Sequence, residues 1–481
     1  MGLRKELEQL LNNSDSVFKE SWETLCYLKE PKNSTDIGQN LVDFQIKLAT
    51  ILFEIERFRQ KVSVEEKKIK KNQKRYNYKW FVNKLKTFAH YKKILIKFTV
   101  IGKSIGDAFV FCFYRFDLQL LSEHFNHRRT LHMPLGIGGT GELEFIRRMR
   151  LIDGKMTIYH GITNILRIGD VSFFDMENLH IASIGEIKTK KAEDNKITIN
   201  LIMLGPKDRK WFKNEEEKEI KPLDIDYFDK DRLERQLKSM SEALKVYIPS
   251  DSNQNSSQDI EEEYYCKFIE KLYSISSYSK LTFIQASEGL LYAGIKSKSK
   301  NAIVKYLNPR PNKIPERDIK TGTDFVTKII KKSSSQNGLI YSRLQYGLND
   351  LDNLVRGAIP LFWMPINNEI LKDLYFEDFQ VVSLFNPVHL IERLITKGII
   401  VKSKYYDNDQ QLSETKKPRI TAEYFDLYIP FITSFLQTEN SIVIIFDLIE
   451  TEYFVKEDKV NTRIEIKMQQ FVEKYMFKPS R

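Results

Sequence analysis

Asp170, Glu186 and Lys188 lie within one segment that contains two β-rich stretches, residues 155–191. Two β-rich stretches in it, ILRIGDVSFFD and LHIASIGEIK, flank a short polar turn at residues 176–178. This pattern predicts an antiparallel hairpin. Because side chains alternate between the faces of a strand, we expect Glu186 and Lys188 on the same face.

The register of this hairpin decides what chemistry the three residues can perform. A turn centred near Glu177 would place Asp170 opposite Glu186, or one diagonal step away, whereas a slip of one residue would separate them. Two neighbouring carboxylates repel, and a shared divalent cation is the usual way in which both stay ionised. Mg²⁺, or Mn²⁺ in its place, suits carboxylate, water and phosphate oxygens and can activate water. Lys188 would position that water and offset negative charge in the transition state.

On these residues the segment resembles the PD-(D/E)xK nuclease superfamily, whose core carries a hairpin with an Asp and then a Glu-x-Lys triplet. Gly169 stands before Asp170 where the family usually has Pro, and Glu186, Ile187 and Lys188 supply the triplet. The resemblance covers roughly residues 140 to 247. It implies a metal-dependent nuclease in which Asp170 and Glu186 bind the metal ion, and it favours DNA over RNA as the substrate.

The resemblance also implies two further residues at the site. The family often carries a Glu on the helix before the hairpin, and GELEFIRRMRL offers Glu142 and Glu144, of which we choose Glu144. One branch of the family carries a Gln on the following helix, and Gln236 in DRLERQLKSMSEAL supplies it. Accessory regions on such cores are common in restriction and anti-phage defence proteins, and by that analogy we expect a defence role.

Glu-Ile-Lys occurs twice more, at Glu219 and Glu465. Glu219 follows the charge run NEEEKE, which favours a solvated loop or helix. Glu465 is the stronger rival because Asp447 lies upstream on an apolar stretch, but only 14 residues follow Lys467. That is too few for the strand and helix that complete the family's core.

The charge balance favours a polyanionic partner. The chain has 76 Lys+Arg against 65 Asp+Glu, a formal net charge of +11, and nucleic acid is the expected partner. The stretch KKIKKNQKRYNYKWFVNKLK mixes cations with aromatic rings, which could hold phosphates and stack on bases, or could be a solvated helix with core aromatics. The residues expected to contact nucleic acid are Lys74, Arg75, Tyr76, Lys79, Lys190 and Lys191.

The chain is expected to form a mixed α/β protein with several domains. Residues 1–97 read as a helical N-terminal region, and residues 98–249 as an α/β domain. The resemblance implies that this second domain is restriction-endonuclease-like, with a mixed sheet flanked by helices. Residues 250–263 are polar and of low complexity, as in a linker or mobile loop. Residues 264–481 are expected to form a C-terminal mixed α/β domain, with buried strands at VRGAIPLFWMP and SIVIIFDLI.

Other chemistry is not favoured. Gly102, Lys103 and Ser104 do not make a phosphate-binding loop because Lys97 stands where its first glycine is needed. The segment HFNHRRTLH has no HExxH or Cys partner that would indicate a metal site, and His160 beside the hairpin reads as a loop or core residue with some reach toward the site.

Three scattered cysteines and the lack of a long apolar stretch predict a cytoplasmic protein without a membrane segment. Two alternatives to a nuclease stay open. One is a catalytically inactive module of the same fold that binds nucleic acid or protein. The other is a structural or signalling subunit that works through its C-terminal region. A homo-oligomer or a defence-system partner protein is compatible with each of these.

Overall fold

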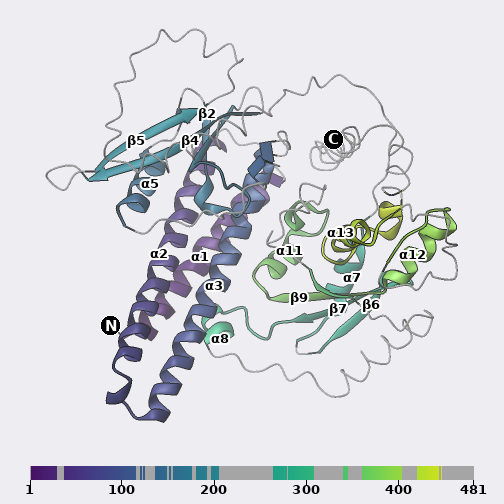
Figure 1. The fold of residues 1–481 in the computed structure, drawn as a ribbon, viewed down its shortest axis with the longest axis horizontal. Helices are drawn as coiled ribbons and strands as arrows, with labels where there is room; N and C mark the ends of the chain where they lie inside the picture. Colours follow the sequence, from purple (N-terminus) through teal and green to yellow (C-terminus); the bar gives the residue numbers. More distant parts are fainter. Residues whose placement is uncertain are drawn as a thin grey trace, which may run out of the picture. The chain divides into compact units, whose positions relative to one another are not determined.

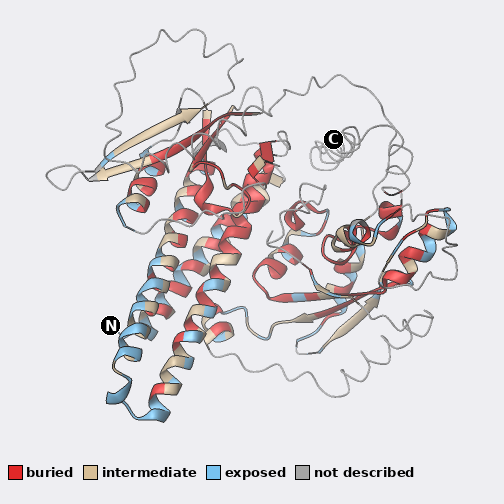
Figure 2. Ribbon diagram, in the orientation of Figure 1, coloured by how far each residue is buried: buried red, intermediate tan, exposed pale blue. Residues whose placement is uncertain are grey.

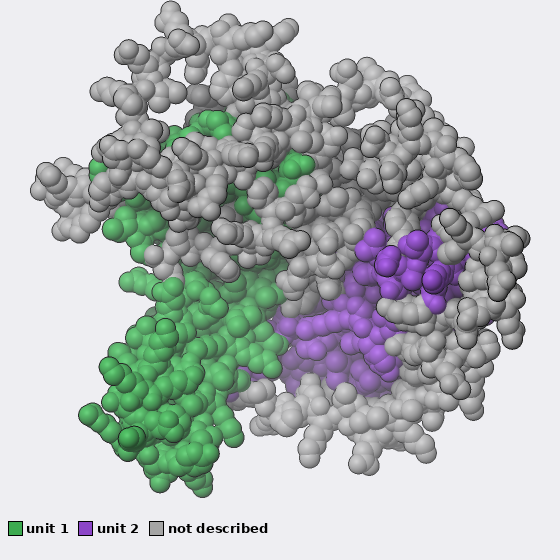
Figure 3. Space-filling view, viewed as in Figure 1, with its two compact units in different colours: residues 1–254, 347–351 green, residues 255–346, 352–481 purple. Residues whose placement is uncertain are grey.

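The computed structural model describes residues 2–29, 37–114, 120–121, 123–124, 136–148, 151–152, 155–175, 180–191, 197–204, 264–278, 280–307, 340–344, 360–403, 420–443 and 446 (Figure 1). The chain divides into two compact units, residues 1–254 with 347–351, and residues 255–346 with 352–481 (Figure 3). The division at residue 254 falls inside the expected linker, residues 250–263, which itself lies outside the described residues.

Three long helices form the N-terminal part of unit 1: α1 (Leu3–Lys29), α2 (Ile37–Lys71) and α3 (Tyr78–Tyr114). Apolar residues recur at three- and four-residue spacing along α1, so one stripe of this helix is buried. Lys47 pairs with Glu20 and Lys61 with Glu6, which ties α2 to α1 at their exposed margins. The predicted helical N-terminal region is confirmed.

The boundary predicted at residue 97 is wrong, because it falls inside α3. This helix continues to Tyr114, and all of its residues from Ile101 onward are buried. The change of composition near Lys97 therefore marks the point where α3 becomes enclosed, and the helices and the sheet belong to one compact unit.

The sheet of unit 1 has the strand order β1-β2-β3-β4-β5, and every pair of its described neighbouring strands is antiparallel. The mixed sheet predicted for this region is therefore wrong for the strands that the structure describes. Its strands are β1 (Leu151–Ile152), β2 (Lys155–Tyr159), β3 (Val171–Asp175), β4 (His180–Lys191) and β5 (Ile197–Leu204), and helix α5 (Ile137–Arg148) precedes them. Beyond the short strand β1, Gln45 of α2 completes the edge of β2: its amide donates to Thr157 O at 2.8 Å and accepts from Tyr159 N at 2.8 Å. The predicted hairpin is confirmed as β3 and β4.

A β-bulge sets the register of this hairpin. Near the turn Phe174 pairs with Ile181, but beyond the bulge Phe173 pairs with Ser183 and Val171 with Gly185. The bulge adds one residue to β4, so the register extended one step past Val171 and Gly185 sets Asp170 level with Glu186. Without the bulge the extended register would set Asp170 opposite Gly185. Asp170 itself precedes β3, and it bonds to Gly185 O and Ile187 N of β4.

Unit 2 contains a second antiparallel sheet, of order β6-β7-β9-β8. Its strands are β6 (Thr282–Gln285), β7 (Leu290–Lys296), β8 (Ile340–Arg343) and β9 (Phe379–Phe385). The helices are α7 (Cys266–Ile275), α8 (Ala302–Leu307), α11 (Asn368–Tyr375), α12 (Pro387–Thr396) and α13 (Ala422–Thr433). Helix α12 has the local signals of a helix start, with Pro387 in its first turn and the side chain of Asn386 capping Val388 N. The C-terminal region is therefore mixed α/β, as predicted.

Two predicted buried strands in this region are wrong where the structure describes them. Residues 361–363 form the 3-10 helix η6 (Leu361–Trp363), which follows Pro360, and residues 439–443 are helical. Both stretches are apolar without a clear period, and such short runs do not distinguish a buried strand from a buried helix.

No helix in the described residues has the length and apolarity to span a bilayer.

Candidate functional site

The structure brings the three residues of the motif together at one end of the β3–β4 hairpin. Lys188 Nζ donates to Glu186 Oε1 at 2.8 Å, so these two side chains share a face. Asp170, immediately before β3, bonds to β4 twice: its backbone N–H donates to Gly185 O at 2.8 Å, and its Oδ2 accepts from Ile187 N at 2.7 Å. The Glu186 and Lys188 side chains are 4% and 14% exposed, so their charges interact with little screening by water.

A third carboxylate comes from helix α5, and it is Glu142. Its Oε2 accepts from Tyr159 OH at 2.6 Å, and its side chain is buried. The residue chosen from the sequence, Glu144, instead pairs with Arg148 at 2.6 Å on the exposed side of the helix. We therefore replace Glu144 by Glu142 in the site. Glu142 precedes the buried residues Phe145 and Ile146 by three and four positions, and that helical spacing is the signal that distinguishes it.

Burial, with a further contribution from mutual repulsion, raises the pKa of two of these carboxyl groups. Burial, and then the negative charges of Glu186 and Glu142, hold the pKa of Asp170 well above its usual range. Burial and the charge of Glu186 raise the pKa of Glu142 to about 7, although the hydrogen bond from Tyr159 lowers it. The charges of Asp170, Glu186, Glu142 and Lys188 therefore act on one another, and the raised pKa values of Asp170 and Glu142 favour the protonated acids when no cation is bound.

This set of donors fits a hard divalent cation. It consists of carboxylate oxygens, and a divalent cation would offset both causes of the raised pKa of Asp170, which are burial first and the charges of Glu186 and Glu142 second. In the part of the chain that the structure describes, no three His, Cys, Asp or Glu side chains are grouped as a metal site. Mg²⁺ commonly needs only one or two carboxylates, with water and substrate oxygens completing its shell. Asp170 and Glu186 would be that pair.

The loop that carries Asp170, residues 160–170, is held by helix α3. Asp107 on α3 accepts from Thr163 Oγ1 at 2.5 Å and from Asn164 N at 2.6 Å. Gly106 lies so close to this loop that a Cβ there would meet Ile162 O at 2.0 Å. The long helix thus fixes the start of the loop, and the position of Asp170 depends on α3 as well as on the hairpin.

A directional chain of hydrogen bonds fixes the end of the same loop. His124 Nδ1 accepts from the backbone N–H groups of Arg167 and Ile168 at 3.0 and 3.1 Å, so the ring proton is on Nε2, which lies 3.4 Å from Tyr114 OH. Tyr114 OH contacts Ser172 Oγ, which contacts His160 Nε2, each at 2.5 Å.

His160 is the last side chain of this hydrogen-bonded series, and it bonds to Gly169, the residue before Asp170. Its Nδ1 lies 3.0 Å from Gly169 O, a carbonyl that can only accept, so Nδ1 carries the proton and Nε2 accepts from Ser172. Burial lowers the pKa of His160 to about 3, and the ring is neutral at pH 7. The His160 backbone N–H also donates to Asp170 O at 2.9 Å. His160 is therefore a positioning residue for Asp170, and no local sequence pattern indicated its bonding partners.

Replacing His160 by alanine should remove the donor to Gly169 O and the acceptor for Ser172 Oγ, lowering the free energy of unfolding by roughly 2–4 kcal/mol. If the site cleaves DNA, kcat should fall about tenfold while KM stays unchanged, because His160 is buried away from any substrate. His160→Asn can still donate to Gly169 O and should recover part of kcat. Urea unfolding and steady-state kinetics measure these effects. Equal kcat in the alanine and wild-type proteins would contradict the positioning role.

Gly169 occupies a backbone conformation that proline cannot adopt. Its φ is +69°, whereas proline is restricted to about −65°. A Cβ at this position would lie 2.6 Å from Ile184 Cγ2 and 2.9 Å from Gly185 O. Glycine therefore allows the chain to turn into β3 while Asp170 stays against β4.

Gly169→Ala should lower the free energy of unfolding by roughly 3 kcal/mol, the sum of a left-handed backbone and a clash with β4. Gly398→Ala is the matched control, because Gly398 has φ +79° and open space around its Cβ position. It should show the backbone cost alone, about 1–2 kcal/mol. Equal losses in the two variants, measured by chemical denaturation, would contradict the close approach at Gly169.

Most of the residues predicted to bind nucleic acid lie far from the carboxylates. Lys74, Arg75, Tyr76 and Lys79 are exposed at the turn between α2 and α3 (Figure 2). The turn is 26 residues beyond Gln45, which bonds to β2, and this corresponds to roughly 40 Å of helix. Lys190, in contrast, shares a face of β4 with Glu186 and Lys188.

Two further predicted residues cannot be placed at the site. Gln236 lies outside the described residues, as does the side chain of Lys191.

Neither a family model, a curated protein nor a solved structure matches this chain. The functional argument therefore depends on the geometry of the site.

Proposed function

We propose that the chain is a metal-dependent nuclease of the PD-(D/E)xK type, with its catalytic centre at Asp170, Glu186 and Lys188. The observation that carries the proposal is that Asp170, Glu186 and Lys188 come together at the β3–β4 hairpin, where Glu142 of α5 also acts on Asp170 through its charge. Lys188 donates to Glu186, and the charges of Glu186 and Glu142 raise the pKa of Asp170. Such a strongly perturbed group beside specific charged partners is typical of catalytic sites.

Each residue has a distinct role in the proposed reaction. Asp170 and Glu186 would hold Mg²⁺ or Mn²⁺, which when bound supplies an activated water and offsets charge on the phosphate. Lys188 orients the attacking water and stabilises negative charge on the phosphate in the transition state. Glu142 is a positioning residue whose charge favours binding of a cation. Tyr159 keeps Glu142 in place by donating to it at 2.6 Å.

The order of elements supports a restriction-endonuclease-like core. Helix α5 supplies Glu142, and the following hairpin supplies Asp170 and then the Glu-x-Lys triplet, which is the order that the resemblance implies. We propose DNA as the substrate and restriction or anti-phage defence as the setting. A cytoplasmic location fits this role.

A second candidate is a module of the same fold that binds nucleic acid without cleaving it. It is favoured by one observation: both motif carboxylates already have hydrogen-bond partners within the hairpin, Ile187 N for Asp170 and Lys188 for Glu186.

Cleavage of supercoiled plasmid, linear DNA and RNA separates the two candidates. Wild type should cleave with Mg²⁺ or Mn²⁺ and not with EDTA. Glu186→Gln should lose cleavage, whereas Glu144→Gln, a matched change at an exposed position, should keep it. Binding by wild type without cleavage under any of these conditions would favour the non-catalytic module.

A further inference from the structure

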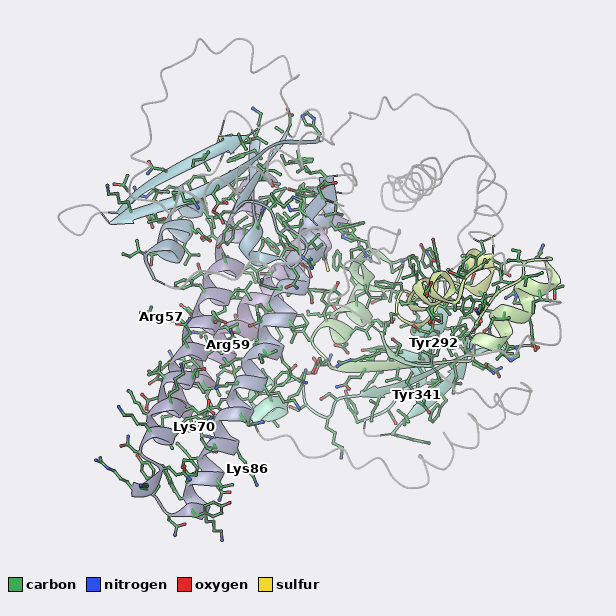
Figure 4. All side chains as sticks on the ribbon, in the orientation of Figure 1. Arg57, Arg59, Lys70, Lys86, Tyr292 and Tyr341 are labelled. Atoms are coloured by element: carbon green, nitrogen blue, oxygen red, sulfur yellow. The ribbon has the colours of Figure 1, made fainter. Side chains whose placement is uncertain are left out.

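The α2–α3 hairpin carries an uninterrupted excess of positive charge. Residues 67–106 contain 13 Lys or Arg and no Asp or Glu. They cover the end of α2, the turn and most of α3. Figure 4 shows Lys70 on α2 and Lys86 on α3 toward the free end of this hairpin. A solvated helix in this protein ordinarily mixes charges, as α1 does with Arg4–Glu8 and Lys19–Asp15.

Four of these lysines form one line on the solvent side of α3, which we call the lysine stripe: Lys79, Lys86, Lys93 and Lys97. Spacings of seven and four residues return to nearly the same side of a helix. The opposite side of α3 is buried through Phe81, Phe88, Tyr91, Leu95 and Phe98. Among the described residues, Lys79, Lys86 and Lys93 form no ion pair. The stripe is about 27 Å long, which corresponds to roughly eight phosphates of one strand at about 3.4 Å each.

Exposed aromatic rings lie at the turn where the stripe begins. Tyr76, Tyr78 and Trp80 are 38%, 77% and 45% exposed. The rings of Tyr76 and Trp80 lie 4.6 Å apart at an angle of 32°. Large exposed rings beside unpaired cations are the features by which proteins hold the bases and phosphates of single strands.

We propose that the lysine stripe and these aromatic residues bind the backbone and bases of a nucleic acid strand that leads to the carboxylate site. This inference rests on the proposed nuclease function for the destination of the strand. An anionic membrane is the less suitable partner, because surface-binding helices need a continuous apolar face. On this hairpin the exposed aliphatic residues are Val64 and Ile96, one on each helix.

Fluorescence anisotropy with labelled DNA of about 30 nucleotides, single- and double-stranded, tests the proposal in EDTA, so that no cleavage is needed. The stripe variant combines Lys79→Ala, Lys86→Ala and Lys93→Ala. The control variant combines Lys5→Ala, Lys267→Ala and Lys271→Ala, which removes the same three charges from exposed positions on α1 and α7. The aromatic variant combines Tyr78→Ala and Trp80→Ala.

The stripe variant should bind duplex at least about tenfold more weakly near 0.15 M salt, with a salt slope smaller by roughly 2.7. The control variant should stay within about twofold of wild type. The aromatic variant should lose more affinity for the single strand than for the duplex. Equal losses in the stripe and control variants, no loss in either, or no DNA binding by wild type would overturn the proposal, as would stripe-dependent binding to vesicles of anionic lipid without binding to DNA. DNA binding that is weakened in the stripe variant, together with no cleavage by wild type in Mg²⁺, would instead reject the nuclease function. The lysine stripe would then still be a nucleic-acid-binding surface.

Discussion

Lys188→Met should lower the rate of Mg²⁺-dependent DNA cleavage by about 10²–10³-fold, the effect of removing one preorganised charge from a transition state. Lys188 is 14% exposed and donates to Glu186 at 2.8 Å, so its ammonium is held at the carboxylates. Methionine keeps the apolar stem and removes the charge. Single-turnover cleavage of a labelled duplex measures the change directly.

Lys190→Met is the matched control for this prediction. Lys190 lies two residues further along the same face of β4, outside the Glu186 ion pair. Its replacement should change the single-turnover rate by less than about threefold, while weakening DNA binding slightly. Comparable rate losses in both variants would show that cleavage requires only positive charge along β4, and that Lys188 has no special role.

At pH 8, Glu142→Gln should raise the free energy of unfolding of the metal-free protein. The change in this free energy caused by the substitution should be more favourable at pH 8 than at pH 5 by roughly 3 kcal/mol. Burial and Glu186 raise the pKa of Glu142 from 4.5 to about 7 in the folded protein. An acid whose pKa is higher in the folded than in the unfolded protein stabilises the fold at pH values below its unfolded-state pKa. This contribution is lost as the pH rises through the folded-state pKa, about 7 here. Glutamine stays neutral and can still accept the hydrogen bond of Tyr159.

Urea unfolding in EDTA between pH 5 and pH 8 measures this prediction. Glu144→Gln is the control, because Glu144 lies at the surface in an ion pair with Arg148, and the difference between that variant and wild type should not change with pH. Mg²⁺ should restore stability to wild type at pH 8 by binding the folded state. A stability difference between wild type and Glu142→Gln that is the same at every pH would contradict the proposed crowding of acids.

The hairpin, and the common face of Glu186 and Lys188, could be predicted from the sequence because strand alternation is a local property. The bulge that brings Asp170 level with Glu186 could not, because the turn suggested a register only to within a residue or two. Glu142 was missed because two glutamates lie on one helix, and only the side of α5 that packs inward distinguishes them.

The support for the loop depends on contacts between residues far apart in sequence. Tyr114 and Ser172 are separated by 58 residues, and Gln45 and Tyr159 by 114. No local pattern predicts such pairs. The length of α3 was also missed, since its buried half carries polar residues such as Lys103 and Asp107 that bond to the loop. The apolar run at Ile442 and Val443 was interpreted as a strand because its period was ambiguous.

The most direct test of the central claim is the binding of Mn²⁺, measured by calorimetry, to wild type, Asp170→Asn and Glu144→Gln. Asparagine can still accept from Ile187 N, so the hairpin should be preserved. Wild type and Glu144→Gln should each bind Mn²⁺ more tightly as pH rises from 6 to 8, and Asp170→Asn should lose at least about tenfold in affinity. Equal Mn²⁺ affinity in wild type and Asp170→Asn, or no binding by wild type, would contradict a shared cation at Asp170 and Glu186.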